Sequence, residues 1–163
     1  MRNIILIGMM GCGKTTVGKL LSTRLGKTLV DTDALIERQE GMTVPEIFET
    51  QGEAYFRSVE TGVAQALSLR TDLIIACGGG LPLQKEAMAA LKGSGTVFWL
   101  DRDPGEIFDT EDLSGRPLAQ EGREKFVALG EARREVYQGW ADVTVTDFTS
   151  PISTAARVLE VVK

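Results

Sequence analysis

A glycine-rich segment near the start of the chain has the residues and spacing of a phosphate-binding loop. Residues 8–15 are Gly-Met-Met-Gly-Cys-Gly-Lys-Thr and match the pattern G-x-x-x-x-G-K-[ST]. The glycines permit turns that point backbone N–H groups inward, while Lys14 would supply a charge for the phosphates and Thr15 a hydroxyl for Mg²⁺. A glycine-rich turn with a solvated lysine is the alternative. The apolar run before the loop and the helical pattern after it favour the phosphate site.

Two carboxylates, Asp31 and Asp33, follow a short run of β-forming residues. One could hold Mg²⁺ through water, and the other could accept the proton of a substrate hydroxyl group. The alternative is structural, with Asp33 capping the next helix and Asp31 ending the strand. The nearby phosphate loop favours the functional interpretation. Because the chain has no histidine, a carboxylate is the expected proton acceptor.

Two further features suggest a site for a small anionic substrate. Arg57 and Glu60 are three residues apart in a helical pattern, so they can pair and hold the guanidinium group in position for a substrate carboxylate. An exposed intrahelical ion pair is the commoner case for such spacing. Gly78-Gly79-Gly80 follows an apolar run and forgoes side-chain packing, which predicts close approach of the backbone to a small ligand. A tight loop is the alternative here.

Other polar residues are weaker candidates. Arg116, Arg133 and Arg134 could neutralise a transferring phosphate or hold a substrate anion, although most charged helix faces are only solvated. Cys12 beside the loop lysine could be a reactive thiol, but a small unreactive loop residue is the preferred interpretation. Trp99 lies in an apolar run and is expected in the core.

A layered fold must position these residues. Runs of β-forming residues predict five strands, at residues 3–7, 28–31, 72–77, 96–100 and 143–146. Helical periodicity and capping residues predict helices at residues 15–25, 33–40, 45–52, 53–69, 84–91, 123–137 and 151–162, with a short helix from residue 104 and a turn at residues 93–95. Continuous apolar strands are typical of parallel sheets covered on both faces. We therefore expect an α/β, three-layer α/β/α fold with a five-stranded parallel sheet, the phosphate loop after the first strand, and sites at the carboxyl ends of the strands.

Length and composition limit the functional classes. At 163 residues the chain is expected to form a single domain, and the polar, aperiodic residues 109–122 are expected to form a mobile lid within it. A net charge of −5 argues against nonspecific binding to nucleic acid, and no apolar run approaches the ~20 residues of a membrane span. Two cysteines without histidine favour a reduced, cytoplasmic protein. We expect a monomer.

Taken together, the motifs resemble those of the shikimate kinases along nearly the full chain. The resemblance rests on residues 8–15, Asp31-Thr32-Asp33, Phe56-Arg57-x-x-Glu60, Gly78-Gly79-Gly80, Arg116-Pro117-Leu118 and Arg134-x-x-Tyr137. It implies a nucleoside monophosphate kinase-like fold and transfer of the γ-phosphoryl group of ATP to the 3-hydroxyl of shikimate, on the route to chorismate and aromatic amino acids.

The resemblance also implies roles for the matching residues. Lys14, Asp33 and Arg116 would be catalytic, with Asp33 binding the shikimate hydroxyls and able to act as base. The implied nucleotide-binding residues are Gly11, Cys12, Gly13, Lys14, Thr15, Thr16 and Arg116, and Thr15 and Asp31 would serve Mg²⁺. The implied substrate-binding residues, within a helical segment at 33–61 and beyond it, are Asp33, Arg57, Glu60, Gly78, Gly79, Gly80 and Arg134. Arg57 and Arg134 would grip the carboxylate, and Glu60 would orient Arg57.

Two segments depart from the family pattern. The arginine that usually packs on adenine is missing from residues 147–151, where Phe148 could stack on the base instead, and residues 108–112 are acidic where the family often has arginine. A kinase for gluconate or a nucleoside monophosphate is one alternative function. A non-enzymatic nucleotide-binding module is another, but such a module would not need Asp33, Arg57 and Arg134 together.

Overall fold

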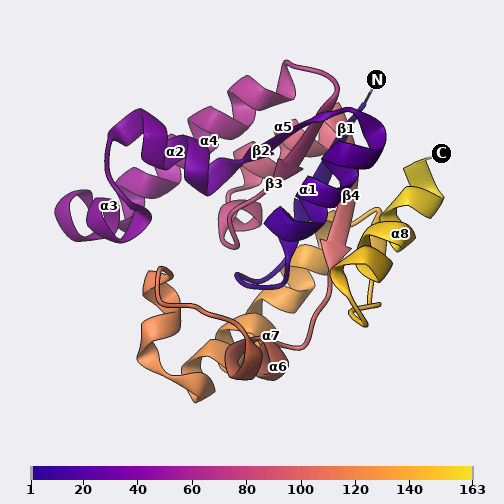
Figure 1. Ribbon diagram of the computed structural model, residues 1–163. Coiled ribbons are helices and arrows are strands. Elements are labelled where there is room, and N and C mark those ends of the chain that lie inside the picture. Colours follow the sequence, from indigo (N-terminus) through magenta and orange to yellow (C-terminus); the bar gives the residue numbers. More distant parts are fainter. Residues whose placement is uncertain (1, 163) are drawn as a thin grey trace.

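The computed structural model describes residues 2–162, and its centre is a five-stranded sheet (Figure 1). The strands are β1 (Asn3–Ile7), β2 (Thr28–Asp31), β3 (Leu73–Ala76), β4 (Gly95–Leu100) and β5 (Val143–Val145). All pair in parallel, in the order β2-β3-β1-β4-β5. After β1 the chain forms β2 and β3 on one side of β1, and it then crosses to form β4 and β5 on the other side. The crevice at the carboxyl end of β1 is therefore the place where such sheets bind ligands.

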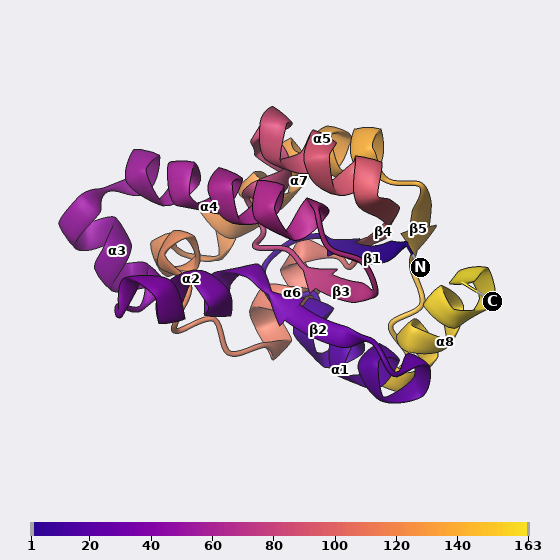
Figure 2. The ribbon, with the colours of Figure 1, turned by 90° about the horizontal axis from the view of Figure 1, so that it is seen from above.

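Helices cover both faces of the sheet, as Figure 2 shows. On one face α1 (Lys14–Leu25) packs against α8 (Pro151–Val162). The other face carries α4 (Glu53–Ser68), α5 (Lys85–Ser94) and α7 (Arg123–Trp140). Every residue of β1 and β3 is buried, which explains the apolar sequence of β3 and of β1 after Asn3. The expected three-layer α/β/α fold is confirmed.

The remaining elements stand at the carboxyl edge of the sheet. They are α2 (Thr32–Glu40), α3 (Val44–Gln51), α6 (Pro104–Thr110) and two 3₁₀ turns at Leu81–Leu83 and Pro117–Glu121. The helices α2 and α3 project to one side, and residues 111–122 run from α6 past them before entering α7 (Figure 1). The segment at 111–122 therefore spans the open edge of the sheet, where the strands end.

Several predicted helix starts are confirmed. Thr43 and Glu46 form a complete capping box at α3, and the Asp103 carboxylate accepts from the backbone N–H of Glu106 at 3.0 Å. Each cap satisfies N–H groups that have no partner within the helix. None of the helices within residues 2–162 combines the length and apolar character that a membrane span requires.

The expected turn at residues 93–95 is wrong. Helix α5 continues to Ser94, and Gly95 is already the first residue of β4. A Cβ atom on Gly95 would stand 2.0 Å from the carbonyl oxygen of Asn3. The glycine is therefore needed for close contact with β1, and sequence alone does not distinguish this need from a turn.

Candidate active site

The phosphate loop connects β1 to α1. Gly8, Gly11 and Gly13 have φ values of 148°, 81° and 106°, which residues with side chains rarely adopt. Gly13 is the N-cap of α1, so the loop ends at the positive end of a helix dipole. A cavity of about 150 Å³, here called the phosphate cavity, opens over the loop. Its lining includes the expected nucleotide-binding residues Gly11, Gly13, Lys14, Thr15, Thr16 and Arg116.

The ammonium group of Lys14 is held within the loop. Its Nζ donates to the carbonyl oxygens of Gly8 and Met9 at 2.7 and 2.9 Å, and it lies 3.7 Å from Sγ of Cys12. Lys14 is only 9% exposed and lines the phosphate cavity. The alternative of a solvated lysine on a simple turn is therefore wrong, because this charge is fixed at the wall of an anion-shaped cavity.

Asp31 connects the phosphate loop to α2. Its Oδ2 accepts from the Thr15 hydroxyl at 2.5 Å, and its Oδ1 accepts from the backbone N–H of Ala34 at 3.1 Å. Asp31 rather than Asp33 is thus the N-cap of α2, and the structural alternative for Asp33 is wrong. The Thr15 and Asp31 oxygens fit Mg²⁺, which prefers oxygen ligands and is usually held by one or two protein groups together with substrate phosphates. Within residues 2–162 there is no cluster of three or more acidic, cysteine or histidine ligands.

Asp33 is free of a capping role and faces the lid segment. Its Oδ2 accepts from Nη1 of Arg116 at 3.1 Å. Burial raises the pKa of the Asp33 carboxyl above its usual value, while the charge of Arg116 opposes that rise. A carboxylate with little water around it is a stronger acceptor for a substrate hydroxyl group than a solvated one.

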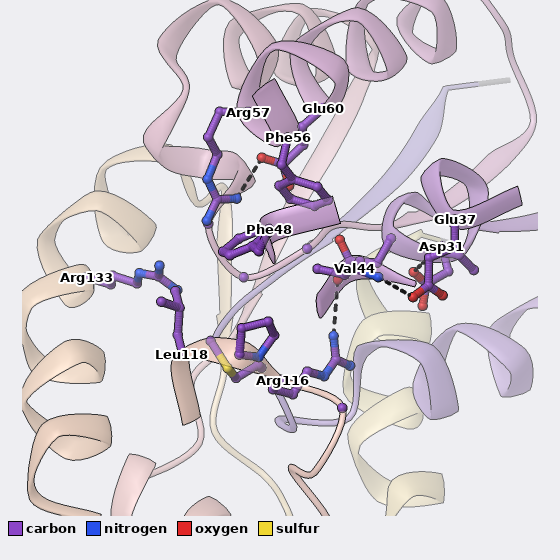
Figure 3. Close-up of a pocket in the computed structure, with 18 residues that line it drawn as sticks. Asp31, Glu37, Val44, Phe48, Phe56, Arg57, Glu60, Arg116, Leu118 and Arg133 are labelled. Carbon is purple, nitrogen blue, oxygen red and sulfur yellow. Dashed lines mark hydrogen bonds and ion pairs between the residues drawn. The ribbon is translucent and has the colours of Figure 1, made fainter. Parts of the chain in front are cut away.

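A second cavity, of about 330 Å³, lies between the lid segment and helices α2, α3 and α4 (Figure 3). We call it the acceptor cavity. Arg57, Glu60 and Arg133 contribute charge to its wall, and Phe48 and Leu118 contribute apolar surface. A concave site with apolar walls and a few charged groups is suited to a small anionic molecule.

The predicted pair of Arg57 and Glu60 is confirmed, and it is more buried than a surface pair. Nη1 of Arg57 donates to Oε1 of Glu60 at 2.9 Å, and the two side chains are 14% and 0% exposed. The Arg57 guanidinium also lies 5.2 Å from the ring centre of Phe56. Burial raises the pKa of Glu60 to about 7, against the opposing effect of Arg57. Oε2 of Glu60 has no hydrogen-bond partner among the described residues.

The three successive glycines allow charged side chains to approach the backbone. The nearest atom to a Cβ on Gly78 would be Oδ1 of Asp33 at 2.6 Å, and on Gly80 it would be Nη2 of Arg57 at 2.5 Å. A Cβ on Gly79 would lie 3.3 Å from Nη1 of Arg133. The close approach that the structure shows is therefore to the chain's own cavity-lining groups, which any side chain at these positions would displace.

Comparisons with known proteins agree with this geometry. The family model described as shikimate kinase matches residues 10–163. The chain belongs to the shikimate kinase family. It is 38% identical to a shikimate kinase of Persephonella marina, with 98% of both chains covered, and 43% identical to one of Synechococcus sp. strain CC9902, with 98% of this chain and 85% of the relative covered.

Solved structures give the same family. A shikimate kinase from Acinetobacter baumannii in complex with shikimate matches with a TM-score of 0.92 at 37% identity, covering 99% of this chain and 93% of the other. A shikimate kinase from Aquifex aeolicus matches with a TM-score of 0.82, also at 37% identity, covering 97% and 94%. The fold recognised from the sequence is thus that of the family.

The structure separates two adjacent arginines of α7. Arg133 is 4% exposed and lines the acceptor cavity, and its Nε and Nη1 have no hydrogen-bond partner among the described residues. Arg134, the expected substrate ligand, does not line this cavity. Its guanidinium pairs with Asp101 at 2.8 Å and lies over Trp99. One helical residue corresponds to a rotation of about 100°, so neighbours on α7 face different surroundings. Of the two arginines, Arg133 lines the acceptor cavity.

Two residues of the family motifs, Thr32 and Tyr137, were given no role from the sequence, and the structure shows that both contact the glycine segment. The Tyr137 hydroxyl donates to the carbonyl oxygen of Gly79 at 2.6 Å, and the backbone N–H of Gly78 donates to the Thr32 hydroxyl at 2.9 Å. Burial raises the pKa of Tyr137 to about 12, so it remains a donor. Arg133 and Tyr137 are four residues apart and share one face of α7. The four-residue spacing from Tyr137 was therefore the sequence signal that could have favoured Arg133 over Arg134 as a cavity residue.

Trp99 and Cys12 are both buried. Trp99 is 4% exposed and lies in the core, as predicted. Cys12 is 2% exposed, and a thiol that is closed to solvent matches the preferred interpretation of an unreactive loop residue better than the reactive one.

Proposed function

We propose that this protein is a shikimate kinase, transferring the γ-phosphoryl group of ATP to the 3-hydroxyl of shikimate. The observation that carries the proposal is that the phosphate cavity and the acceptor cavity meet. Both are lined by Asp31, Asp33, Gly78, Gly79 and Arg116. A donor phosphate over the loop and a hydroxyl group in the acceptor cavity would therefore come together at Asp33 and Arg116.

The charges of the acceptor cavity are arranged for a hydroxylated carboxylate. Arg57 and Arg133 supply cationic groups to its wall, and Arg133 carries unpartnered N–H groups that a substrate carboxylate would satisfy. Asp33 stands at the junction with the phosphate cavity. Binding the carboxylate at the arginines would place a ring hydroxyl near Asp33, and positioning of this kind supplies much of the rate in phosphoryl transfer.

The transfer step would use three groups of this chain. Lys14 and Arg116 would neutralise charge on the transferring phosphoryl group. Asp33 would accept the hydroxyl proton as the new phosphate ester bond forms and the bond between the β-phosphate oxygen and the γ-phosphorus of ATP breaks, releasing ADP. Thr15 and Asp31 would hold Mg²⁺, which when bound supplies positive charge to the donor phosphates. Arg116 would have to leave Asp33 for the phosphate when substrates bind.

We propose that residues 1–163 act as one kinase domain, of which Met1 and Lys163 lie outside the described residues. Within it, residues 33–61 would contribute to the acceptor cavity, and residues 109–122 would close over it as a lid. Closure would exclude water, which otherwise competes with the hydroxyl group for the phosphoryl group. We also propose that the protein is a monomer, which sedimentation of the purified protein would test.

An ADP-release assay with Mg-ATP tests this function. We expect turnover with shikimate and none above background with gluconate or nucleoside monophosphates. Gluconate carries its carboxylate on an open chain rather than on a ring that fixes the hydroxyl group relative to it, and nucleoside monophosphates have no carboxylate for the arginines to hold. Turnover with gluconate or a nucleotide alone would establish one of the alternative kinases. ATP binding without turnover on any acceptor would instead favour a regulatory module.

A further inference from the structure

Two backbone N–H groups among the three successive glycines have no hydrogen-bond partner in the described part of the chain. Within residues 2–162, neither the N–H of Gly79 nor that of Gly80 donates to an acceptor. Both residues are buried and line the acceptor cavity. A buried N–H group without a partner is costly, and nearly all such groups in native proteins are satisfied. Oxygen atoms of a bound acceptor would satisfy these two.

The direction of each N–H group is set by the carbonyl of the residue before it, because the two lie on opposite sides of a trans peptide plane. The carbonyl oxygen of Gly78 accepts from the backbone N–H of Leu81 at 3.0 Å, which fixes the peptide that carries the N–H of Gly79. The carbonyl oxygen of Gly79 accepts instead from the Tyr137 hydroxyl at 2.6 Å. A side chain of α7 therefore fixes the peptide that carries the N–H of Gly80.

The peptide between Gly79 and Gly80 needs a restraint of this kind. Glycine adopts φ values of either sign, so a peptide between two glycines can rotate by about half a turn and reverse the direction of its N–H group. Within residues 2–162, no backbone N–H donates to the carbonyl oxygen of Gly79. The hydrogen bond from Tyr137 is therefore what opposes this rotation in the described structure.

Tyr137 is held in place by packing, and a second residue of α7 provides a natural comparison. Tyr137 is 1% exposed, and its ring centre lies 6.0 Å from that of Trp99. Trp140, about one turn further along α7, donates from Nε1 to the carbonyl oxygen of Pro82 at 2.9 Å. Pro82 does not line the acceptor cavity. Both hydrogen bonds tie α7 to the loop after β3, but only the bond from Tyr137 acts on a residue of the cavity.

We propose that Tyr137 is a positioning residue for the acceptor, whose hydroxyl holds the peptide between Gly79 and Gly80 so that the N–H of Gly80 donates to an oxygen of the substrate. Tyr137 itself does not line the acceptor cavity, so it would act without touching the substrate. This role rests on the proposed binding of shikimate in that cavity.

Kinetics of two matched variants test the role of Tyr137. Tyr137→Phe keeps the ring and removes the hydroxyl, and Trp140→Phe removes the other hydrogen bond to the same loop. In Tyr137→Phe the KM for shikimate should rise roughly tenfold, while kcat and the calorimetric affinity for Mg-ATP change by less than about twofold. Trp140→Phe should be less stable in urea unfolding but keep the KM of the unmodified protein.

A double variant separates the glycine contact from a contact with Arg133. The charge of Arg133 opposes the rise in the pKa of Tyr137, so Arg133 is near enough to be another group through which Tyr137 could act. In the Arg133→Ala background, Tyr137→Phe should still raise the KM for shikimate roughly tenfold. Loss of the effect in that background would assign Tyr137 to Arg133 and overturn its role at Gly79.

Amide hydrogen exchange gives a test that does not require any variant to fold. In the unmodified protein, adding shikimate should slow the exchange of the Gly80 N–H, as measured by NMR. An unchanged exchange rate would overturn the proposed contact.

The remaining outcomes are also decisive. Equal rises in KM for Tyr137→Phe and Trp140→Phe would mean that both bonds merely keep the loop in place, and an unchanged KM in Tyr137→Phe would remove its role. Either result with an active unmodified protein rejects this inference alone. Absence of shikimate-dependent ADP release from the unmodified protein rejects the proposed function, and the role of Tyr137 with it.

Discussion

The acceptor cavity and the lid both carry charged side chains, but they hold them in opposite ways. In the acceptor cavity Glu60 is 0% and Arg133 is 4% exposed. Arg116 in the lid is 40% exposed, and the pair of Asp109 with Arg123, which follows the lid, is about half exposed. Buried charges are costly to leave unpaired, whereas exposed pairs contribute little and break easily.

The difference in exposure suits the buried charges to substrate recognition and the exposed charges to movement of the lid. The buried groups are fixed by packing and by glycines that leave room for them, so they can select a substrate of one charge pattern. The exposed groups can exchange partners at low cost, which suits a segment that must open and close. Substitutions in the acceptor cavity should therefore change activity strongly. Matched substitutions in exposed pairs that line neither cavity, such as Arg123 with Asp109, should change it little.

The largest effect is expected for Asp33→Asn. Without a proton acceptor at the junction of the two cavities, kcat should fall by roughly 10²- to 10⁴-fold. ATP binding should remain, because Asp33 caps no helix. ADP release and calorimetry measure the two quantities. Asp109→Asn, which removes an exposed partner of Arg123, is the control and should leave kcat nearly unchanged. Equal loss of turnover and ATP binding would instead make Asp33 a structural residue.

The next largest effect distinguishes Arg133→Ala from Arg134→Ala. Removing one partner of a buried, charged contact costs about 2–5 kcal/mol, so Arg133→Ala should raise the KM for shikimate by roughly 30-fold or more. Arg134 is 43% exposed and pairs with Asp101, so its removal should leave the KM within about threefold. Steady-state kinetics, with ATP affinity as a check on folding, measures both. A larger KM effect at Arg134 would restore the original prediction from sequence.

Features formed by residues close together in the sequence could be predicted from the sequence alone. The phosphate loop was predictable because its chemistry is written in consecutive residues, and the Arg57–Glu60 pair because it lies within one helix. The five strands were predictable because each contains a short run of β-forming residues, and the run is continuously apolar in β3. In all of these, neighbours in sequence are neighbours in space.

Contacts between distant segments were beyond such prediction. The rotation of α7 against the sheet decides which of Arg133 and Arg134 lines the acceptor cavity. The close approach of β4 to β1 decides that residue 95 must be a glycine. The partnership of Asp33 with Arg116 spans 83 residues. Each of these depends on how elements pack together, which residue type and spacing do not specify.

A smaller effect is expected at the glycines that make room for the buried charges. In Gly80→Ala the new Cβ would lie 2.5 Å from Nη2 of Arg57, so the guanidinium must move and the KM for shikimate should rise about tenfold, equivalent to about 1.4 kcal/mol. Gly93→Ala is the control, since a Cβ there meets nothing within 4 Å. It should leave the KM unchanged and stabilise α5 by about 0.5–1 kcal/mol. An unchanged KM in Gly80→Ala would mean that Arg57 can shift without loss.

The smallest effect concerns the stability cost of burying Glu60. Its pKa of about 7 lies above the ordinary value of 4.5, so between pH 4.5 and 7 the folded protein retains a proton that the unfolded chain releases. The free energy of unfolding should therefore fall as pH rises through this window and level off above it. Glu60→Gln should reduce that fall by on the order of 1–2 kcal/mol, as measured by urea unfolding at pH 5 and pH 7.5.

Glu53→Gln provides the matched control for this pH dependence. Glu53 also pairs with Arg57, but its side chain is 54% exposed, so its substitution should leave the fall in stability intact. Asp33, whose pKa burial also raises, is unchanged in both variants and contributes equally to each curve. If the free energy of unfolding fell equally between pH 5 and pH 7.5 in the unmodified protein and in both variants, Glu60 would not be the group that releases a proton in this pH range. The contrast between buried and exposed charges would then lie in geometry alone.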